Sequence, residues 1–138
     1  MVKRVCLILI FLGAVAACSH PQTNQKLFAT YPTFKVFDKG YQEVWEAVLG
    51  SLKDYRLLRA EKENGYVKSA LVQKNPQERF EFEIIVKRQR EDKTSVTINN
   101  YIQRYQKGVG WKNITSNTTF EHLILTEIEK SLKKREER

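Results

Sequence analysis

The sequence predicts an α+β domain in which two helices pack on one face of an antiparallel sheet. Two observations favour this class. Between residues 55 and 105, segments of alternating apolar and polar residues follow one another with short turns between them, as in hairpin-linked strands. On either side of this region, apolar residues recur with the 3.6-residue period of an amphipathic helix. Because a run of antiparallel strands is flanked by the helices, the expected order is β-α-β-β-β-β-α, with both helices on the same face.

The first elements are a strand and a helix. A strand is expected over Thr33–Phe37, where Phe34 and Val36 alternate with the other three residues. A helix is predicted over Gly40–Lys53, with Asp38 as its N-cap. Its apolar stripe, including a tryptophan that we expect in the core, consists of Tyr41, Val44, Trp45, Val48 and Leu52.

A hairpin is expected next. Its strands are predicted over Tyr55–Ala60 and Tyr66–Val72. Between them, Asn64 and Gly65 supply the left-handed backbone positions that a tight hairpin turn needs.

A second hairpin follows a turn at residues 74–77. Its strands are predicted over Arg79–Gln89 and Ser95–Tyr105. In the first of them the alternation puts Phe80, Phe82, Ile84 and Val86 on one face; in the second it puts Val96, Ile98 and Ile102 there.

The C-terminal part is predicted as a loop and a helix. Gln106–Ser116 is expected to be a loop containing two glycines. The last helix is expected to begin near Asn117 or Thr118, because Thr118 and Glu121 have capping-box spacing. Its expected apolar stripe is Phe120, Leu123, Ile124, Ile128 and Leu132.

The N-terminal segment has the pattern of an export signal. Lys3 and Arg4 precede an apolar run over Val5–Val15, which is too short to cross about 30 Å of hydrocarbon as a helix. The four residues Val15-Ala16-Ala17-Cys18 resemble the lipobox of bacterial lipoproteins. The resemblance implies that residues 1–17 are removed and that Cys18 becomes a lipid-modified N-terminus. The alternative is an ordinary cleaved signal that leaves Cys18 as a free thiol.

A lipidated Cys18 would anchor the chain to a membrane. Because one acyl chain gives only marginal binding, two or three chains would make a lasting anchor. Ser19 follows the cysteine, and by the best-known lipoprotein sorting rule its identity favours the outer membrane, with the domain facing the periplasm. Residues 18–30 would then be a polar tether spanning about 20 Å as a flexible coil, and residues 31–138 a single domain.

Composition restricts the function further. The formal net charge is +8, of which Lys3 and Arg4 contribute two, and this balance favours acidic partners. Export makes nucleic acid an unexpected partner. With Cys6 in the signal segment and Cys18 lipidated, we expect no disulfide, so that the fold depends on packing alone.

The domain also resembles a known family. The pattern Tyr41-x-x-Val44-Trp45-x-x-Val48-x-x-x-Leu52 is similar to the first helix of the helix-grip domains of BamC, the lipoprotein accessory of the outer-membrane β-barrel assembly machine. The Asn64-Gly65 hairpin occurs at the corresponding place. The resemblance covers about residues 31–135 and implies a single helix-grip or TBP-like domain, where that family has two.

We expect no catalytic, metal or cofactor site. The two histidines are His20, in the tether, and His122, which is expected to be partly exposed on the last helix. No spacing of histidine and cysteine suits a metal ion. Glu81 and Glu83 lie about 7 Å apart on one strand face; we interpret them as a solvated face because Lys87 continues the same polar row, with an acid/base pair as the alternative.

A cluster of aromatic and cationic residues favours partner binding. Aromatic and arginine side chains are enriched at protein interfaces, and they would also stack on a sugar. In the alternative interpretation Trp111 only covers the edge of the sheet.

Three hypotheses for the function follow from these observations. The first is a non-enzymatic scaffold that binds envelope proteins; the others are a carrier of a lipid or similar apolar ligand, and a peptidoglycan-binding module. The candidate binding residues are Tyr101, Arg104, Tyr105, Lys107, Trp111 and Lys112.

Overall fold

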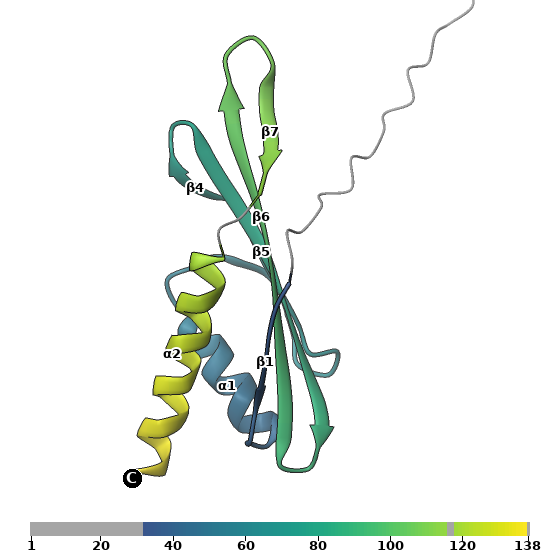
Figure 1. The fold of residues 1–138 in the computed structure, drawn as a ribbon. Helices are drawn as coiled ribbons and strands as arrows, with labels where there is room; N and C mark the ends of the chain where they lie inside the picture. Colours follow the sequence, from purple (N-terminus) through teal and green to yellow (C-terminus); the bar gives the residue numbers. More distant parts are fainter. Residues whose placement is uncertain (1–31, 116–117, 138) are drawn as a thin grey trace, which may run out of the picture.

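The computed structural model describes residues 32–115 and 118–137, and in them an antiparallel sheet carries two helices on one face (Figure 1). This confirms the predicted α+β class, the helix-grip or TBP-like arrangement. The sheet has seven strands, so the predicted run of four strands between the helices is in fact six. In chain order the elements are β1 (Thr33–Phe37), α1 (Tyr41–Ser51), β2 (Leu57–Glu61), β3 (Tyr66–Ser69), β4 (Val72–Asn75), β5 (Glu78–Arg90), β6 (Lys93–Gln106), β7 (Gly110–Ile114) and α2 (Thr119–Glu136).

The long hairpin of β5 and β6 is the centre of the sheet. The strand order is β1-β6-β5-β3-β2, while β7 also pairs with β6 and β4 with β5. Figure 1 shows that β4, β7 and the adjoining ends of β5 and β6 extend beyond the helices. We call this part, made of β4, β7, residues 78–80 of β5 and residues 102–106 of β6, the projecting end of the sheet.

The core lies between the helices and the sheet. Trp45 is 3% exposed, as its helical phase predicted. An aromatic cluster joins the layers, because Phe120 of α2 lies 5.0 Å from Phe82 of β5 and 5.7 Å from Tyr55, measured between ring centroids. Such packing holds each helix against the sheet by burying apolar area.

The predicted strand over Tyr66–Val72 is wrong in extent. It is divided into β3 and β4, because the chain leaves the sheet at Ala70, whose N–H donates to the carbonyl of Arg56. Beside this break the buried hydroxyl of Ser69 accepts a hydrogen bond of 2.9 Å from the N–H of Phe82. The Ser69 hydroxyl therefore replaces a backbone carbonyl as the hydrogen-bond partner of one strand N–H. The alternation of apolar and polar residues in the sequence does not predict such a replacement.

The predicted loop over Gln106–Ser116 is also wrong, because it contains β7. Gly108 and Gly110 have φ values of +82° and +93° and turn the chain back along β6. The register pairs Tyr105 with Trp111 and Gln106 with Gly110. The glycines thus make a hairpin turn instead of a flexible loop.

The helix ends differ in detail from those predicted. Gly40 is the N-cap of α1, while Asp38 forms an ion pair with Lys93 at 3.1 Å. Thr118 precedes α2 with a left-handed φ of 60°, unlike the extended backbone typical of a capping box.

The predicted apolar stripe of α2 is confirmed except at Leu123. Its buried face is Glu121, Ile124, Leu125, Ile128 and Leu132, whereas Leu123 is 54% exposed. Phe120 packs against this core as predicted, and Glu121 and Leu125 join the buried face in place of Leu123.

Candidate binding surface

The face of the sheet opposite the helices, here called the open face, carries no helix in the part of the chain that the structure describes (Figure 1). Its residues follow from the strand register, because directly paired residues of antiparallel strands point to the same side. At its edge Phe34 and Val36 of β1 are 59% and 44% exposed. They pair with Thr97 and Ser95 of β6, which places them on the open face. Two large apolar side chains therefore face solvent next to the start of the domain.

A polar network around Glu83 occupies the middle of the open face. The carboxylate accepts hydrogen bonds from the hydroxyls of Tyr66 at 2.8 Å and Tyr101 at 3.2 Å. The ammonium of Lys68 lies 3.4 Å from Glu83 and 3.9 Å from Glu81. Both glutamates of the possible acid/base pair are thus engaged with a shared cation.

The network shifts the pKa of its members. Burial raises the pKa of the Glu83 carboxyl, but hydrogen bonds from Tyr66 and Lys68 outweigh this, so that its pKa lies below the usual value. Burial, and then the negative charge of Glu83, raise the pKa of Tyr66 and Tyr101 to about 12. The glutamate therefore stays ionised and both phenols stay neutral over the physiological range.

We expect the phenol titrations of Tyr66 and Tyr101 to have midpoints near 12, measured by NMR of the ring Cζ carbons. The Glu83→Gln substitution should move both midpoints towards 10, because it removes the charge that opposes phenolate formation. Tyr55, whose pKa is raised by burial and then by Asp54, is the internal control and should not move. Midpoints that stay in place in the Glu83→Gln protein would contradict the network.

The stability of the fold should depend on this network at both extremes of pH. The raised tyrosine pKa values stabilise the fold below about pH 10, and this contribution is lost as pH rises from 10 towards 12 because the unfolded chain ionises first. The lowered pKa of Glu83 stabilises the fold above about pH 4.5, and this contribution is lost as pH falls further.

An aromatic and cationic patch lies on the open face of the projecting end. The guanidinium of Arg79 lies 4.1 Å from the ring centroid of Trp111, in cation–π geometry. The ring of Tyr105 meets the indole edge-on, with centroids 5.6 Å apart. Arg79 also donates a 2.8 Å hydrogen bond to Gln103, which fixes the guanidinium over the ring. The result is a pre-organised patch, which we call the Trp111 patch, made of Arg79, Tyr105 and Trp111.

The structure separates the six predicted binding residues. Tyr101, Tyr105 and Trp111 lie on the open face, whereas Arg104 and Lys112 pair with each other in register and point to the opposite side. There Arg104 binds Glu78 at 2.6 Å. Lys107 lies in the β6–β7 turn.

Arg79 is the site residue that the sequence analysis missed. Its register partner is Gln103, two positions before Tyr105 on the same face, so it comes next to the tryptophan only once the strands are aligned. Trp111 lies within β7, which among the described strands pairs only with β6 at this edge of the sheet, and it is half-buried under Arg79.

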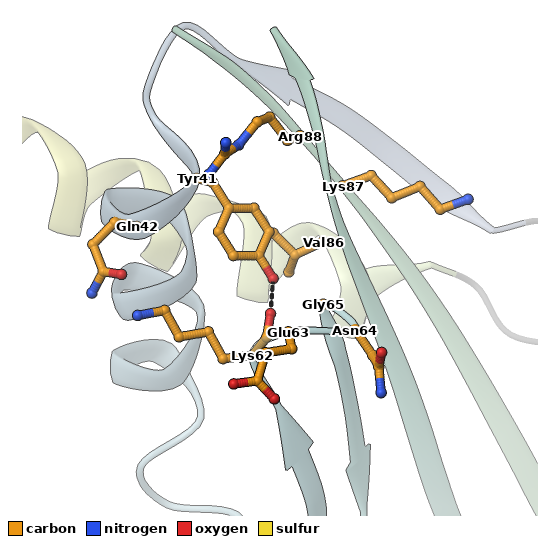
Figure 2. A pocket seen from close by; sticks show the side chains of 9 residues that line it. All are labelled: Tyr41, Gln42, Lys62, Glu63, Asn64, Gly65, Val86, Lys87 and Arg88. Carbon is orange, nitrogen blue, oxygen red and sulfur yellow. Dashed lines mark hydrogen bonds between the residues drawn. The ribbon is translucent and has the colours of Figure 1, made fainter. Parts of the chain in front are cut away.

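A hollow of about 630 Å³ lies beside the start of α1 (Figure 2). The hydroxyl of Tyr41 donates a hydrogen bond across it to the backbone carbonyl of Lys62. Three cations line the hollow, Lys62, Lys87 and Arg88, but Figure 2 shows their charged ends pointing in different directions. A phosphate or carboxylate site needs donors that converge on the ligand, so this arrangement does not favour an anion site.

Two predicted residues remain, His122 and Cys18. His122 is exposed on α2, as expected. Cys18, the predicted lipidation site, lies outside the described residues. Within residues 32–115 and 118–137, no group of three or more potential metal-binding side chains comes together, and neither helix has the length and apolar composition of a membrane span.

Comparisons with known proteins identify related arrangements of the chain only. No protein-family model and no curated protein matches the sequence. A TBP-like protein from Parabacteroides distasonis is similar at 9% identity, over 74% of this chain and 92% of that chain, with a TM-score of 0.46. The adenylate sensor from AMP-activated protein kinase, in complex with ZMP, is similar at 15% identity over 71% and 93%, with a TM-score of 0.43. A DUF4468 family protein from Bacteroides ovatus is similar at 10% identity over 59% of each chain, with a TM-score of 0.39. Similarity at this level leaves the function to be argued from the residues of this chain.

Proposed function

We propose that this chain is a bacterial lipoprotein, anchored in the outer membrane through lipidated Cys18, whose periplasmic domain binds envelope proteins as a non-catalytic scaffold. The observation that carries the binding role is the Trp111 patch, where Arg79, Tyr105 and Trp111 are held together on an uncovered sheet face. The anchor is supported by the lipobox-like residues Val15-Ala16-Ala17-Cys18.

The Trp111 patch has the composition of an interface hot spot. A few hot-spot residues dominate the binding energy of protein interfaces, and tryptophan, tyrosine and arginine are enriched among them. Here the arginine already lies against the indole at 4.1 Å, so little side-chain freedom is lost on binding. The patch lies on the projecting end, beyond the helices, where a partner can approach it (Figure 1).

The anchor would make a weak contact effective. Phe34 and Val36, the exposed apolar residues of β1, lie close along the chain to the predicted tether of residues 18–30. Attachment of a domain by a short tether raises its effective concentration towards other membrane proteins. A patch of modest area is therefore sufficient for a role in an envelope complex.

Site-specific photo-crosslinking in living cells tests this proposal. We expect a photoreactive amino acid at Tyr105 to form a crosslink to a discrete envelope protein, because this ring is 45% exposed within the Trp111 patch. The matched control is Leu58, which is 56% exposed on β2, outside the projecting end. Crosslinks of equal yield at both positions, or none at Tyr105, would count against the patch as a binding site.

Affinity capture of the same partner measures the contribution of the tryptophan. The Trp111→Ala substitution is expected to reduce recovery at least about tenfold, since hot-spot residues contribute about 2 kcal/mol or more. The Leu58→Ala protein is expected to recover the partner like the wild type. Because Trp111 is outside the buried core, its removal should leave the domain folded and lower the thermal unfolding midpoint only through the lost contacts with Arg79 and Tyr105. Unchanged recovery with Trp111→Ala would refute the assignment.

A further inference from the structure

A second pocket lies on the helix side of the sheet, at the base of the projecting end. Its volume is about 300 Å³. Phe80 of β5 and Ile102 of β6 form its floor on the sheet side, and Phe120 and Leu123 of α2 form the opposite wall. The pocket exists because α2 begins at this level and the strands continue past it (Figure 1). Four apolar side chains thus enclose a space that the core does not fill.

Asn100 is a buried polar side chain in the wall of this pocket, whose lining also includes Lys74, Glu78, Arg79 and Thr119. Asn100 is 1% exposed, and its Oδ1 accepts no hydrogen bond from the described residues. Asn100 pairs with Phe82 in the register and takes an inward position among apolar neighbours. A buried carbonyl oxygen without a partner destabilises a fold by about 1–3 kcal/mol. Such a group at a pocket wall is explained if a ligand supplies the missing donor.

We infer that this pocket binds a small molecule with an apolar body and one hydroxyl or amide N–H directed at Asn100. An apolar cavity of about 150 Å³ is enough to hold benzene, so this pocket accommodates a single ring with substituents. It lies at the small end of the range for ligand sites, about 300–1,000 Å³. The donor would satisfy Oδ1, while the apolar body would contact Phe80, Ile102 and Phe120.

Charged residues line the rim of the pocket, and the charge of Glu78 is paired there. Glu78, at the pocket edge, binds Lys74 at 3.1 Å and Arg104 at 2.6 Å. Hydrogen bonds from Arg104 and Lys74 hold the pKa of the Glu78 carboxyl below its usual value. Because Glu78 is paired in this way, it does not offer a free carboxylate that would attract a cation. The favoured ligand is therefore uncharged at its buried end.

A matched pair of probes tests the inference on the full chain in detergent. We expect p-cresol to shift the backbone amide NMR signals of Ile102 and Phe120, and p-methylanisole, in which a methyl group replaces the hydroxyl hydrogen, to bind about tenfold more weakly. The Asn100→Leu protein keeps the volume but loses the acceptor, so it should bind the two probes equally. The Leu123→Trp protein, changed at a 54% exposed position, should bind neither because the larger ring fills the pocket.

Three results would overturn the inference. They are the absence of p-cresol shifts at Ile102 and Phe120, equal affinity of the wild type for both probes, and a preference for p-cresol that persists in Asn100→Leu. The first two need only the wild-type protein, so they decide the matter even if a variant fails to fold. The outcome is also separate from the proposed scaffold role, since the variants change Asn100 and Leu123, which lie outside the Trp111 patch, although Arg79 lines the pocket as well.

Discussion

Replacing Gly65 with alanine is expected to destabilise the domain by about 3 kcal/mol or more, or to prevent folding. Gly65 has a φ of +61°, and an added Cβ would lie 1.9 Å from the backbone oxygen of Val86. The clash is with main chain, not with a flexible side chain, so the whole β2–β3 turn would have to move away from β5. The turn is held there by the hydrogen bond from the N–H of Val86 to the carbonyl of Gly65, at 2.7 Å.

Two other glycines provide matched controls. Gly108 also has a positive φ, +82°, but a Cβ there would meet no atom within 4 Å, so Gly108→Ala should destabilise by only about 1–2 kcal/mol. Gly50 lies inside α1 in open space, and Gly50→Ala should stabilise by about 0.5–1 kcal/mol. Denaturant unfolding followed by circular dichroism measures all three. A Gly65→Ala protein as stable as Gly108→Ala would contradict the close approach to Val86.

The second large effect concerns the membrane. The proposed lipid anchor predicts that Cys18→Ser moves the protein from the membrane fraction to the soluble periplasmic fraction. The reason is that each buried methylene contributes about 0.8 kcal/mol to membrane binding, and loss of the sulfur removes the attachment point of the chains. Fractionation of cells followed by immunoblotting measures the distribution.

Cys6 is the control for this substitution. It lies in the segment that the proposal removes by cleavage, so Cys6→Ser should leave the protein in the membrane fraction. A Cys18→Ser protein that stays membrane-bound would show that something other than a lipid on this cysteine holds it there.

Local sequence patterns predicted much of the fold because they reflect local physics. The alternation of Phe82, Ile84 and Val86 fixed the buried face of β5, and the first strand was predicted with its observed bounds. The errors lie in two hairpins, β4 with β5 and β6 with β7, whose partner strands are neighbours in the sequence. The short strands Val72–Asn75 and Gly110–Ile114 carry no regular alternation of apolar and polar residues, so the sequence pattern did not indicate them.

The binding surface could be predicted from the sequence only in part. Composition pointed to Tyr105 and Trp111, but only the register of β5 against β6 brings Arg79 to them. Asn100 had a usable signal, because it falls in the inward alternation between Ile98 and Ile102, where a polar residue is unexpected. That alternation indicates a buried amide, although the pocket beside it depends on where α2 begins.

The lipid on Cys18 is the central claim, and the intact mass of the mature protein purified from membranes tests it most directly. We expect a chain that begins at Cys18 and carries the added mass of a diacylglyceryl group, with a further acyl chain on its amine. A mature chain that begins at any other residue, or one that begins at Cys18 with an unmodified thiol, would contradict the account.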